Sequence, residues 1–229
     1  MVQQAANLIK KSKKPILYVG GGIIHSKANT ELFDLATKFK IPVVTTLMGR
    51  GAFPDGNELC LEMPGMHGNY TATTSIQNAD LLIAIGVRFD DRVTANPSFF
   101  AQNAKVIHAD IDPAEIGKVR DAEVPIVGDA KSVIKGLMES LGDTNLDTEG
   151  WISELKDMKS KFPLSYKQED KGPLKVPYVL EELQKLTKEE AIVVSGVGQH
   201  QMWISQHWNF TEPNTWLNSG GLGTMGYAL

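Results

Sequence analysis

Short apolar runs alternate with helical segments over the first 141 residues, and this alternation constrains the fold more than any other feature. The apolar runs are 16–19, 42–46, 80–86, 105–109 and 125–128. Runs that are apolar throughout are typical of parallel strands buried on both faces, and the helices between them must cover both sides of the sheet. We therefore predict an α/β fold with a doubly wound parallel sheet of about six strands in residues 1–141.

The pattern changes after a polar, breaker-rich stretch at 142–150, which we take as the domain boundary. Residues 142–173 then read as a linker that contains a polar helix at 151–162. Residues 174–229 read as the first, truncated part of a second α/β domain. Because the sequence stops at Gly226–Leu229, inside an expected amphipathic helix, we expect the chain to be a fragment.

Composition excludes several classes of function. With 23 basic and 27 acidic side chains, the net charge of −4 lacks the basic surface of a nucleic-acid binder. The single cysteine, Cys60, cannot form an intrachain disulfide, and the five histidines form no HxxxH or HxH pair, so no metal site is expected. No apolar run approaches the roughly 18 residues of a membrane helix, and no signal peptide is visible. We expect a soluble, cytoplasmic protein.

Three glycines, Gly20–Gly22, directly follow the first predicted strand, where a doubly wound sheet brings its backbone close to ligands. The dinucleotide fingerprint needs a further glycine where His25 stands, and no acidic residue ends the second strand. A tight turn is therefore favoured over a nucleotide site.

The run Gly86–Arg92 (GVRFDDR) follows the most apolar strand and carries two arginines and two aspartates. Guanidinium groups can bind phosphate or carboxylate through two parallel hydrogen bonds, with an acid beside each to hold it. An ordinary surface cluster of ion pairs is an equally good explanation of the pattern alone.

Three further sites have a structural alternative. The loop Pro64–Gly68 precedes a helix whose first amides suit an anion, although a lone His67 more often bonds backbone. Asp110 ends a strand where it could reach a ribose, whereas Asp112 is better explained as a cap. Asp129 fits an N-cap at least as well as a ligand role.

Two glycine-rich turns in the last third, Ser195–Trp203 and Asn218–Tyr227, follow strand-like segments and open toward helices. Such turns suit diphosphate binding through backbone amides, but as isolated signals they are weak.

Together and in order, these segments resemble one family, the catalytic (large) subunits of acetolactate synthase, also called acetohydroxyacid synthase. The resemblance covers nearly the whole chain and is carried by these motifs: TTLMGRG at 45–51, PGMHG at 64–68, NADLLIAIGVRFDDRV at 78–93, HADIDP at 108–113, GQHQMW at 198–203 and SGGLGTMG at 219–226.

The resemblance implies a central FAD-binding domain followed by the first part of a thiamine-diphosphate-binding domain. The family joins a hydroxyethyl unit of pyruvate, carried on thiamine diphosphate, to pyruvate or 2-oxobutyrate, and so begins branched-chain amino-acid biosynthesis. The family's flavin has no net redox role in that reaction.

The resemblance also assigns site residues. FAD falls on Gly21, Gly22, Leu47, Met48, Gly65, Met66, His67, Gly68, Gly86, Val87, Arg88, Asp90, Arg92, Val93, Asp110 and Asp129. Thiamine diphosphate falls on Val197, Gly198, Gln199, His200, Gly223 and Met225. Arg92 is expected to bind the substrate carboxylate, Met225 to hold the cofactor in its bent conformation, and Gln199 to take part in catalysis.

The family's Mg²⁺ ligands and its activating glutamate have no counterpart in these residues, so the chain alone is expected to be inactive. The family implies a homodimer or tetramer with a regulatory small subunit, and a plastid or mitochondrial location in a eukaryote. Glyoxylate carboligase or pyruvate oxidase, which also pair thiamine diphosphate with FAD, and a non-catalytic nucleotide-binding module remain the alternatives.

Overall fold

A computed structural model describes residues 1–187 and 190–229 of the chain. Five parallel strands form its main sheet, in the order β2-β1-β3-β4-β5. The strands are β1 (Pro15–Val19), β2 (Val43–Thr45), β3 (Leu81–Ile85), β4 (Lys105–Asp110) and β5 (Val124–Val127). Each matches one of the apolar runs, so the predicted α/β class is confirmed, with five strands rather than about six.

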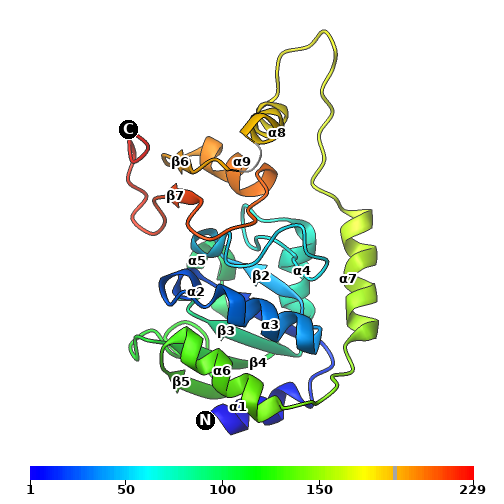
Figure 1. Cartoon of the computed structure of the whole chain (residues 1–229), viewed down its shortest axis with the longest axis vertical. Coiled ribbons are helices and arrows are strands. Elements are labelled where there is room, and N and C mark those ends of the chain that lie inside the picture. The colour runs from blue at the N-terminus through cyan, green and yellow to red at the C-terminus, as the bar shows by residue number, and fades with distance from the viewer. Residues whose placement is uncertain (188–189) are drawn as a thin grey trace.

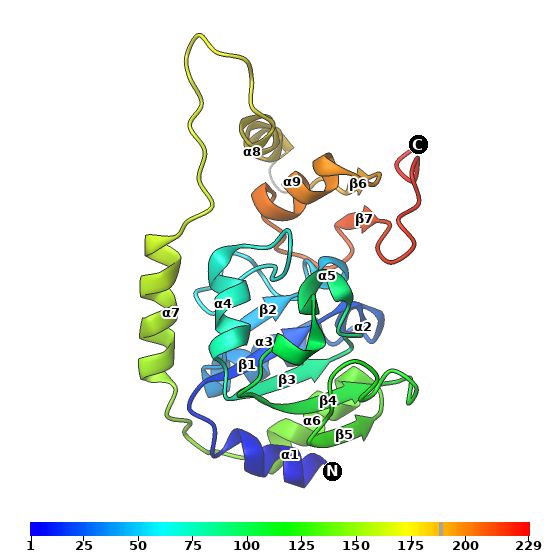
Figure 2. The same ribbon diagram turned by 180° about the vertical axis from the view of Figure 1, so that it is seen from behind.

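Helices cover both faces of this sheet (Figures 1 and 2). Side chains alternate along β1, so that Leu17 and Val19 enter one core while Ile16 and Tyr18 enter the other. The first core is completed by α1 (Val2–Ile9), α2 (Gly21–His25), α3 (Asn29–Phe39) and α6 (Ala130–Leu141), and the second by α4 (Tyr70–Asn78) and α7 (Glu149–Lys161).

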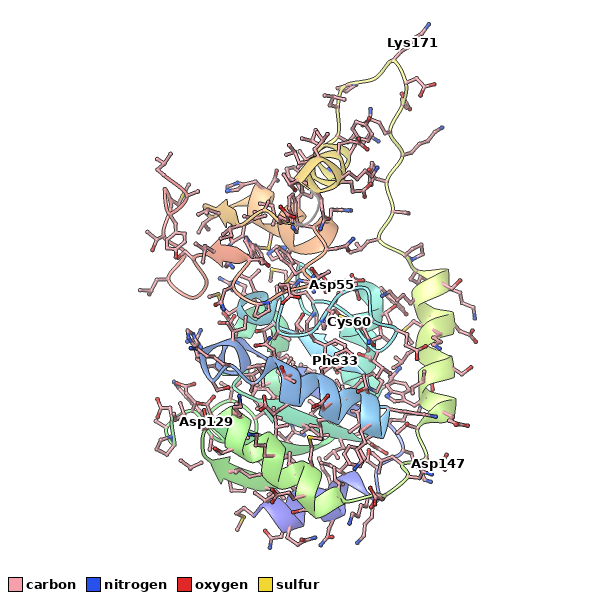
Figure 3. All side chains as sticks on the ribbon, viewed as in Figure 1. Phe33, Asp55, Cys60, Asp129, Asp147 and Lys171 are labelled. Carbon is pink, nitrogen blue, oxygen red and sulfur yellow. The ribbon has the colours of Figure 1, made fainter. Side chains whose placement is uncertain are left out.

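Helix α7 lies in the segment that we predicted as a linker, yet it packs against α4 and the sheet. Trp151 and Leu155 are buried in the second core, and the Trp151 indole donates a hydrogen bond to the Pro15 carbonyl at 3.2 Å. The chain then runs through residues 162–175 without regular structure, with Lys171 at the tip of this excursion (Figure 3).

A second, smaller sheet pairs β6 (Val193–Ser195) with β7 (Trp216–Asn218) in parallel. It is accompanied by α8 (Val176–Thr187) and α9 (Gln199–His207). Their common core consists of Ile204, Trp208, Phe210 and Trp216. The fold class predicted for the second part is therefore confirmed as a partial α/β unit, while the exact domain boundaries stay a prediction.

Two details differ from the sequence-based expectation. The amphipathic helix expected at Gly226–Leu229 is a turn, because so few residues cannot complete enough i→i+4 bonds to hold a helix. Four short elements were not predicted, namely α2, a 3₁₀ turn at Leu47–Gly49, α5 (Asp91–Thr94) and a 3₁₀ turn at Pro97–Phe99.

Candidate functional site

The candidate site lies beyond the carboxyl ends of β1, β2 and β3. Strand β1 has β2 on one side and β3 on the other, so the connection from β1 to β2 runs one way along the sheet and that from β2 to β3 returns the other way past β1. Ligands of open α/β sheets bind at such a switch point. A cavity of about 780 Å³ lies here, between the main sheet and the second sheet.

The glycine turn after β1 is explained mostly by backbone packing. A β-carbon on Gly22 would lie 2.6 Å from Gly86 Cα, and one on Gly20 would collide with the Gly86 carbonyl oxygen. Gly86 itself has a φ of +62°, which favours glycine. The tight turn favoured from the sequence is therefore present, and of the three glycines Gly21 alone lines the cavity.

The Gly86–Arg92 run is anchored by Phe89, which is buried although Arg88 before it is exposed and Asp90 after it is only half-buried. The Phe89 ring packs edge-on against Tyr18 and His108, with ring centroids 5.5 and 5.0 Å apart. Its φ of +52° is strained for a bulky residue. This conformation leaves Arg88 and Arg92 exposed along the cavity wall.

Neither arginine is held tightly. The Arg88 guanidinium lies 3.7 Å from the Asp90 carboxylate, and that of Arg92 lies 3.1 Å from Asp91. Pairs this exposed contribute about 0–1 kcal/mol, so both guanidinium groups can turn to an anionic ligand at little cost. Asp90 also accepts the Arg92 amide at 3.0 Å and so caps α5.

His108 supports this wall from below and is itself fully buried. Its Nε2 lies 2.9 Å from the Val87 carbonyl oxygen, and its Nδ1 accepts the Gly117 amide at 3.4 Å. These partners fit the neutral tautomer with the proton on Nε2. Burial lowers the pKa of His108, against the opposing effects of its bond to Val87 and of Asp110.

The loop 63–69 joins the Arg92 backbone. The Met66 amide donates to the Arg92 carbonyl at 2.8 Å, and a β-carbon on Gly65 would lie 2.5 Å from the same oxygen. Asn69 caps α4 by accepting the Ala72 amide at 2.6 Å. The glycines of PGMHG are therefore required by loop packing, while His67 faces the cavity.

The opposite wall is built by the beginning of α9 and the segment after β7. Gly198 precedes α9 with a φ of +144°, and no side chain in the described part of the chain caps its first amides. Buried Gln201 donates to the Asn218 side chain at 3.2 Å and to the Ser219 carbonyl at 3.0 Å. The two glycine-rich turns noted in the sequence thus meet at this wall.

Two contacts join the walls directly. The Gln206 side chain on α9 donates to the His67 carbonyl at 2.7 Å. A β-carbon on Gly220 would lie 2.5 Å from the sulfur of Met48. Residues from both predicted sets, those for FAD and those for thiamine diphosphate, therefore line one cavity.

Most of the predicted residues line this cavity. They are Gly21, Leu47, Met48, His67, Gly86, Val87, Arg88, Asp90, Arg92, Val93, Val197, Gly198, Gln199 and Gly223. The others lie outside its lining: Gly22, Gly65, Met66, Gly68, Asp110, Asp129, His200 and Met225.

Some of the residues outside the lining have structural roles. Asp129 caps α6 by accepting the Ser132 amide at 3.1 Å, far from the second sheet in Figure 3. Asp110 accepts the Asp112 amide, and Asp112 accepts that of Ala114, each at 2.9 Å. Met225 is 79% exposed.

Sequence reasoning missed several lining residues. Tyr18 lies beneath the Gly86–Arg92 run, and burial together with nearby Asp90 raises its pKa. Gln206 comes from α9, whereas Met202 and Trp203 of the same helix belong to the glycine-rich turn already noted in the sequence. Helical spacing alone could have placed Met202 and Gln206 on one face of α9, four residues apart.

Among residues 1–187 and 190–229, no group of three or more His, Cys, Asp or Glu side chains could hold a metal ion. Over the same residues, every helix is too short or too polar to cross a membrane.

Comparison with known proteins finds two matching domain families. Residues 2–137 match the thiamine pyrophosphate enzyme central domain, and residues 196–229 match the C-terminal TPP binding domain of the same enzymes. The chain is 53% identical to an acetolactate synthase of Mycobacterium leprae, 52% to an acetolactate synthase large subunit of Corynebacterium glutamicum, and 46% to a chloroplastic acetolactate synthase 2 of Nicotiana tabacum.

Each alignment includes all of this chain but only 37%, 37% and 35% of the respective relative. The chain therefore spans a little over a third of the length of these proteins, and the resemblance to acetolactate synthase is confirmed over that span. Since the central-domain match alone includes more than half of the residues, the chain belongs to the thiamine pyrophosphate enzyme family.

Proposed function

We propose that this chain supplies the flavin-binding and part of the thiamine-binding surface of an acetolactate synthase, which joins pyruvate to a second pyruvate or to 2-oxobutyrate. One observation carries the proposal. The run Gly86–Val93 and the α9 turn Val197–Gln199, about 100 residues apart in the sequence, line the same cavity.

The residues present fit thiamine diphosphate. A helix N-terminus with uncapped amides and glycines beside it favours a diphosphate, and α9 begins in this way at Gly198. Gly223, with a φ of +64°, lies against Val197 and lets the backbone approach closely. When bound, thiamine diphosphate supplies the stabilised carbanion that the reaction needs. Gln199 and Met225 keep the roles that the resemblance implies.

The residues present also fit FAD. Gly21 offers a backbone without a side chain at the switch point, and Leu47 and Met48 supply an apolar surface beside it. Arg88 lies 3.6 Å from the β-carbon position of Gly221, so its guanidinium can bridge to the opposite wall. We assign Arg88 to a negatively charged or carbonyl group of the flavin cofactor.

Arg92 is assigned to the substrate. It lines the cavity at the start of α5, and its guanidinium fork matches the carboxylate of a 2-oxoacid. We assign the Mg²⁺ ligands to parts of the full gene product outside these residues. We assign a regulatory small subunit as a partner, because the Corynebacterium relative is named a large subunit.

The test uses the full product of the open reading frame that encodes this chain, hereafter the full gene product. It is expected to form acetolactate from pyruvate when FAD, thiamine diphosphate and Mg²⁺ are supplied. It should also restore growth without valine, leucine and isoleucine to a bacterium that lacks its own enzyme. Conversion of glyoxylate, with no product from pyruvate, would contradict the proposal and favour a glyoxylate carboligase.

A further inference from the structure

A buried ion pair lies at the joint between the two sheets. Arg50 donates to both oxygens of Asp55, with Nη1–Oδ1 and Nη2–Oδ2 distances of 2.7 and 2.6 Å. Both side chains are 2% exposed. Arg50 also donates to the Thr45 hydroxyl at 3.2 Å.

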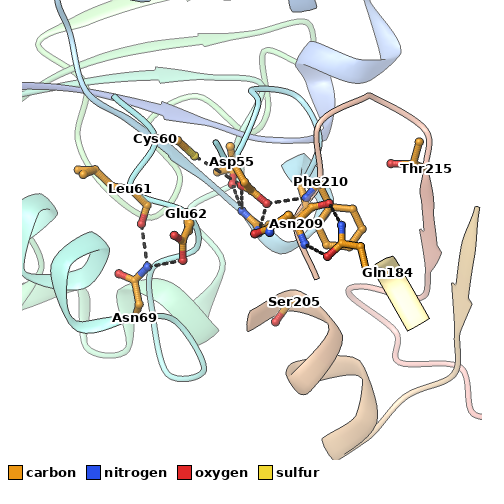
Figure 4. Close-up of polar contacts among 12 residues, drawn as sticks. Asp55, Cys60, Leu61, Glu62, Asn69, Gln184, Ser205, Asn209, Phe210 and Thr215 are labelled. Carbon is orange, nitrogen blue, oxygen red and sulfur yellow. Dashed lines mark hydrogen bonds and ion pairs between the residues drawn. The ribbon is translucent and has the colours of Figure 1, made fainter. Parts of the chain in front are cut away.

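The carboxylate of Asp55 also contacts the segment between α9 and β7, which belongs to the second part of the chain. It accepts the Phe210 amide at 2.7 Å, and the Asp55 amide donates to the Phe210 carbonyl at 3.1 Å (Figure 4). The Arg50 guanidinium lies 5.3 Å from the centre of the Phe210 ring. One residue, 155 positions away, is thus bound through its amide, its carbonyl and its ring.

The turn at Asn209–Phe210 is also held from the other side. Gln184 on α8 donates to the Asn209 carbonyl at 2.7 Å and accepts the Asn209 amide at 3.0 Å (Figure 4). The Phe210 ring stacks on Trp216 of β7 at 5.1 Å. Asp55 is therefore connected to β7 through the backbone and the ring of Phe210.

Both ends of this joint run directly into the cavity. Leu47 and Met48 precede Arg50 by two or three residues, and Ser219–Gly223 follow β7. Met48 and Gly220 touch so closely that a β-carbon on Gly220 would lie 2.5 Å from the Met48 sulfur. A displacement of the turn would change the spacing of these two walls.

A buried ion pair is a poor way to gain stability alone, because desolvation of both charges offsets their attraction. Burial raises the pKa of Asp55, and Arg50 opposes that rise by favouring the charged carboxylate. What the pair supplies is a carboxylate fixed in one orientation, with one oxygen directed at the Phe210 amide.

We propose that Asp55, oriented by Arg50, is a positioning residue that anchors the Asn209–Phe210 turn and so sets the spacing between the flavin-side and thiamine-side walls of the cavity. The inference rests on the proposed function for its cofactor names but concerns contacts within this chain.

The test compares two double variants of the full gene product. Arg50→Met with Asp55→Asn removes both charges and keeps an oxygen for the Phe210 amide. Arg50→Met with Asp55→Leu removes the charges and that oxygen as well. Neither leaves a buried charge without a partner, so both are expected to fold. Lys14→Met with Glu154→Leu, a pair at 2.7 Å within the first part of the chain, is the control for loss of an ion pair.

The first readout is hydrogen–deuterium exchange at residues 209–223 without cofactor. The leucine variant is expected to exchange there about tenfold faster than the asparagine variant, since one anchoring hydrogen bond differs between them. The control variant should match the parent. Equal exchange in both double variants would overturn the proposal.

The second readout is FAD affinity, measured by quenching of flavin fluorescence. The leucine variant should bind FAD about tenfold more weakly than the asparagine variant, at a similar melting temperature. Equal affinity in the two variants would show that Asp55 only stabilises the fold. If the parent binds no FAD, the proposed function fails, and the exchange comparison still decides the role of Asp55.

Discussion

At the residue scale, the two arginines of the Gly86–Arg92 run have different surroundings. Arg88 reaches toward Gly221 of the opposite wall, whereas Arg92 lies against Asp91 and has its carbonyl bound by the Met66 amide. The backbone of Arg92 is therefore fixed while its guanidinium is free to bind. This difference supports separate cofactor and substrate roles.

We expect Arg92→Lys in the full gene product to reduce discrimination between pyruvate and 2-oxobutyrate more than it reduces FAD occupancy. Lysine keeps the charge but cannot form the two parallel hydrogen bonds of a guanidinium. Competition between the two acceptors, with flavin content measured on the same samples, checks this. Loss of flavin with an unchanged acceptor ratio would assign Arg92 to the cofactor.

Arg88→Ala tests the cofactor role of the other arginine. FAD binding is expected to weaken by about 1.5–3 kcal/mol in this variant.

Gly65→Ala is expected to destabilise the chain by about 1–3 kcal/mol, because φ there is +97° and the new β-carbon would collide with the Arg92 carbonyl. Gly56→Ala is the matched control, since a β-carbon at that position meets nothing within 4 Å. Urea denaturation of both variants measures the difference. Equal midpoints would mean that the loop can move away from Arg92 without cost.

His108 makes the stability of the fold depend on pH. Because burial lowers its pKa in the folded chain below the ordinary value of 6.5, the unfolded chain binds the proton first. Stability is therefore expected to fall as the pH drops below about 6.5, by at most about 1.4 kcal/mol per pH unit for this group. The pKa of His207 is lowered in the same way and adds to the effect.

Denaturant titrations from pH 7 to pH 5 check this prediction. His108→Gln should be less stable at pH 7, because it loses the fitted contacts to Val87 and Gly117, and its stability should fall less steeply toward pH 5. If the free energy of unfolding of His108→Gln falls with pH as steeply as that of the parent, His108 does not cause the loss of stability toward pH 5.

At the element scale, the strands were predictable because each is a short, mostly apolar run. Leu81–Ile85 is wholly apolar in sequence, and the structure buries it along its whole length. Helix α2 was not predictable, because its five residues begin with two glycines, which disfavour a helix. Gly22 of this helix packs closely against Gly86, a contact that the local sequence does not indicate. The joint at Asp55 and Phe210 gave no local signal, since the two residues are 155 positions apart.

The candidate site was predictable in part for the same reason. Residues that follow strand ends, such as Arg88 and Arg92, could be assigned to one edge of the sheet. Residues that enter the cavity from a helix of the second part, such as Gln206, depend on how the two parts meet. Position after a strand is not sufficient, however. Asp129 also follows a strand, but it caps a helix and does not line the cavity.

Helix α7 gives an element-scale prediction about the extent of the first folded unit. Trp151 and Leu155 fill one face of the main sheet, so residues 1–163 should fold with a higher melting temperature than residues 1–146. Burying two such side chains contributes about 3–6 kcal/mol. Thermal unfolding of the two truncated chains measures this. Equal melting temperatures would mean that α7 belongs to a linker and not to the first unit.

At the scale of the whole molecule, the two parts differ in how much core they have. The main sheet is covered by two apolar clusters, whereas the described residues of the second part, 174–187 and 190–229, form one cluster of four buried side chains around a two-stranded sheet. A two-stranded sheet is marginally stable in water by itself. The second part is therefore expected to depend on its joint with the first, through Asp55 and through the Gln206 contact with His67.

This difference predicts that the 229-residue chain unfolds in two steps, with the second part first. Three of its four tryptophans, Trp203, Trp208 and Trp216, lie in the second part, while most of the helix and strand lies in the first. In guanidinium chloride, the midpoint from tryptophan fluorescence should then fall below that from far-UV circular dichroism. Coincident midpoints would instead show that the contacts at Asp55 and His67 join the two sheets into one cooperative unit.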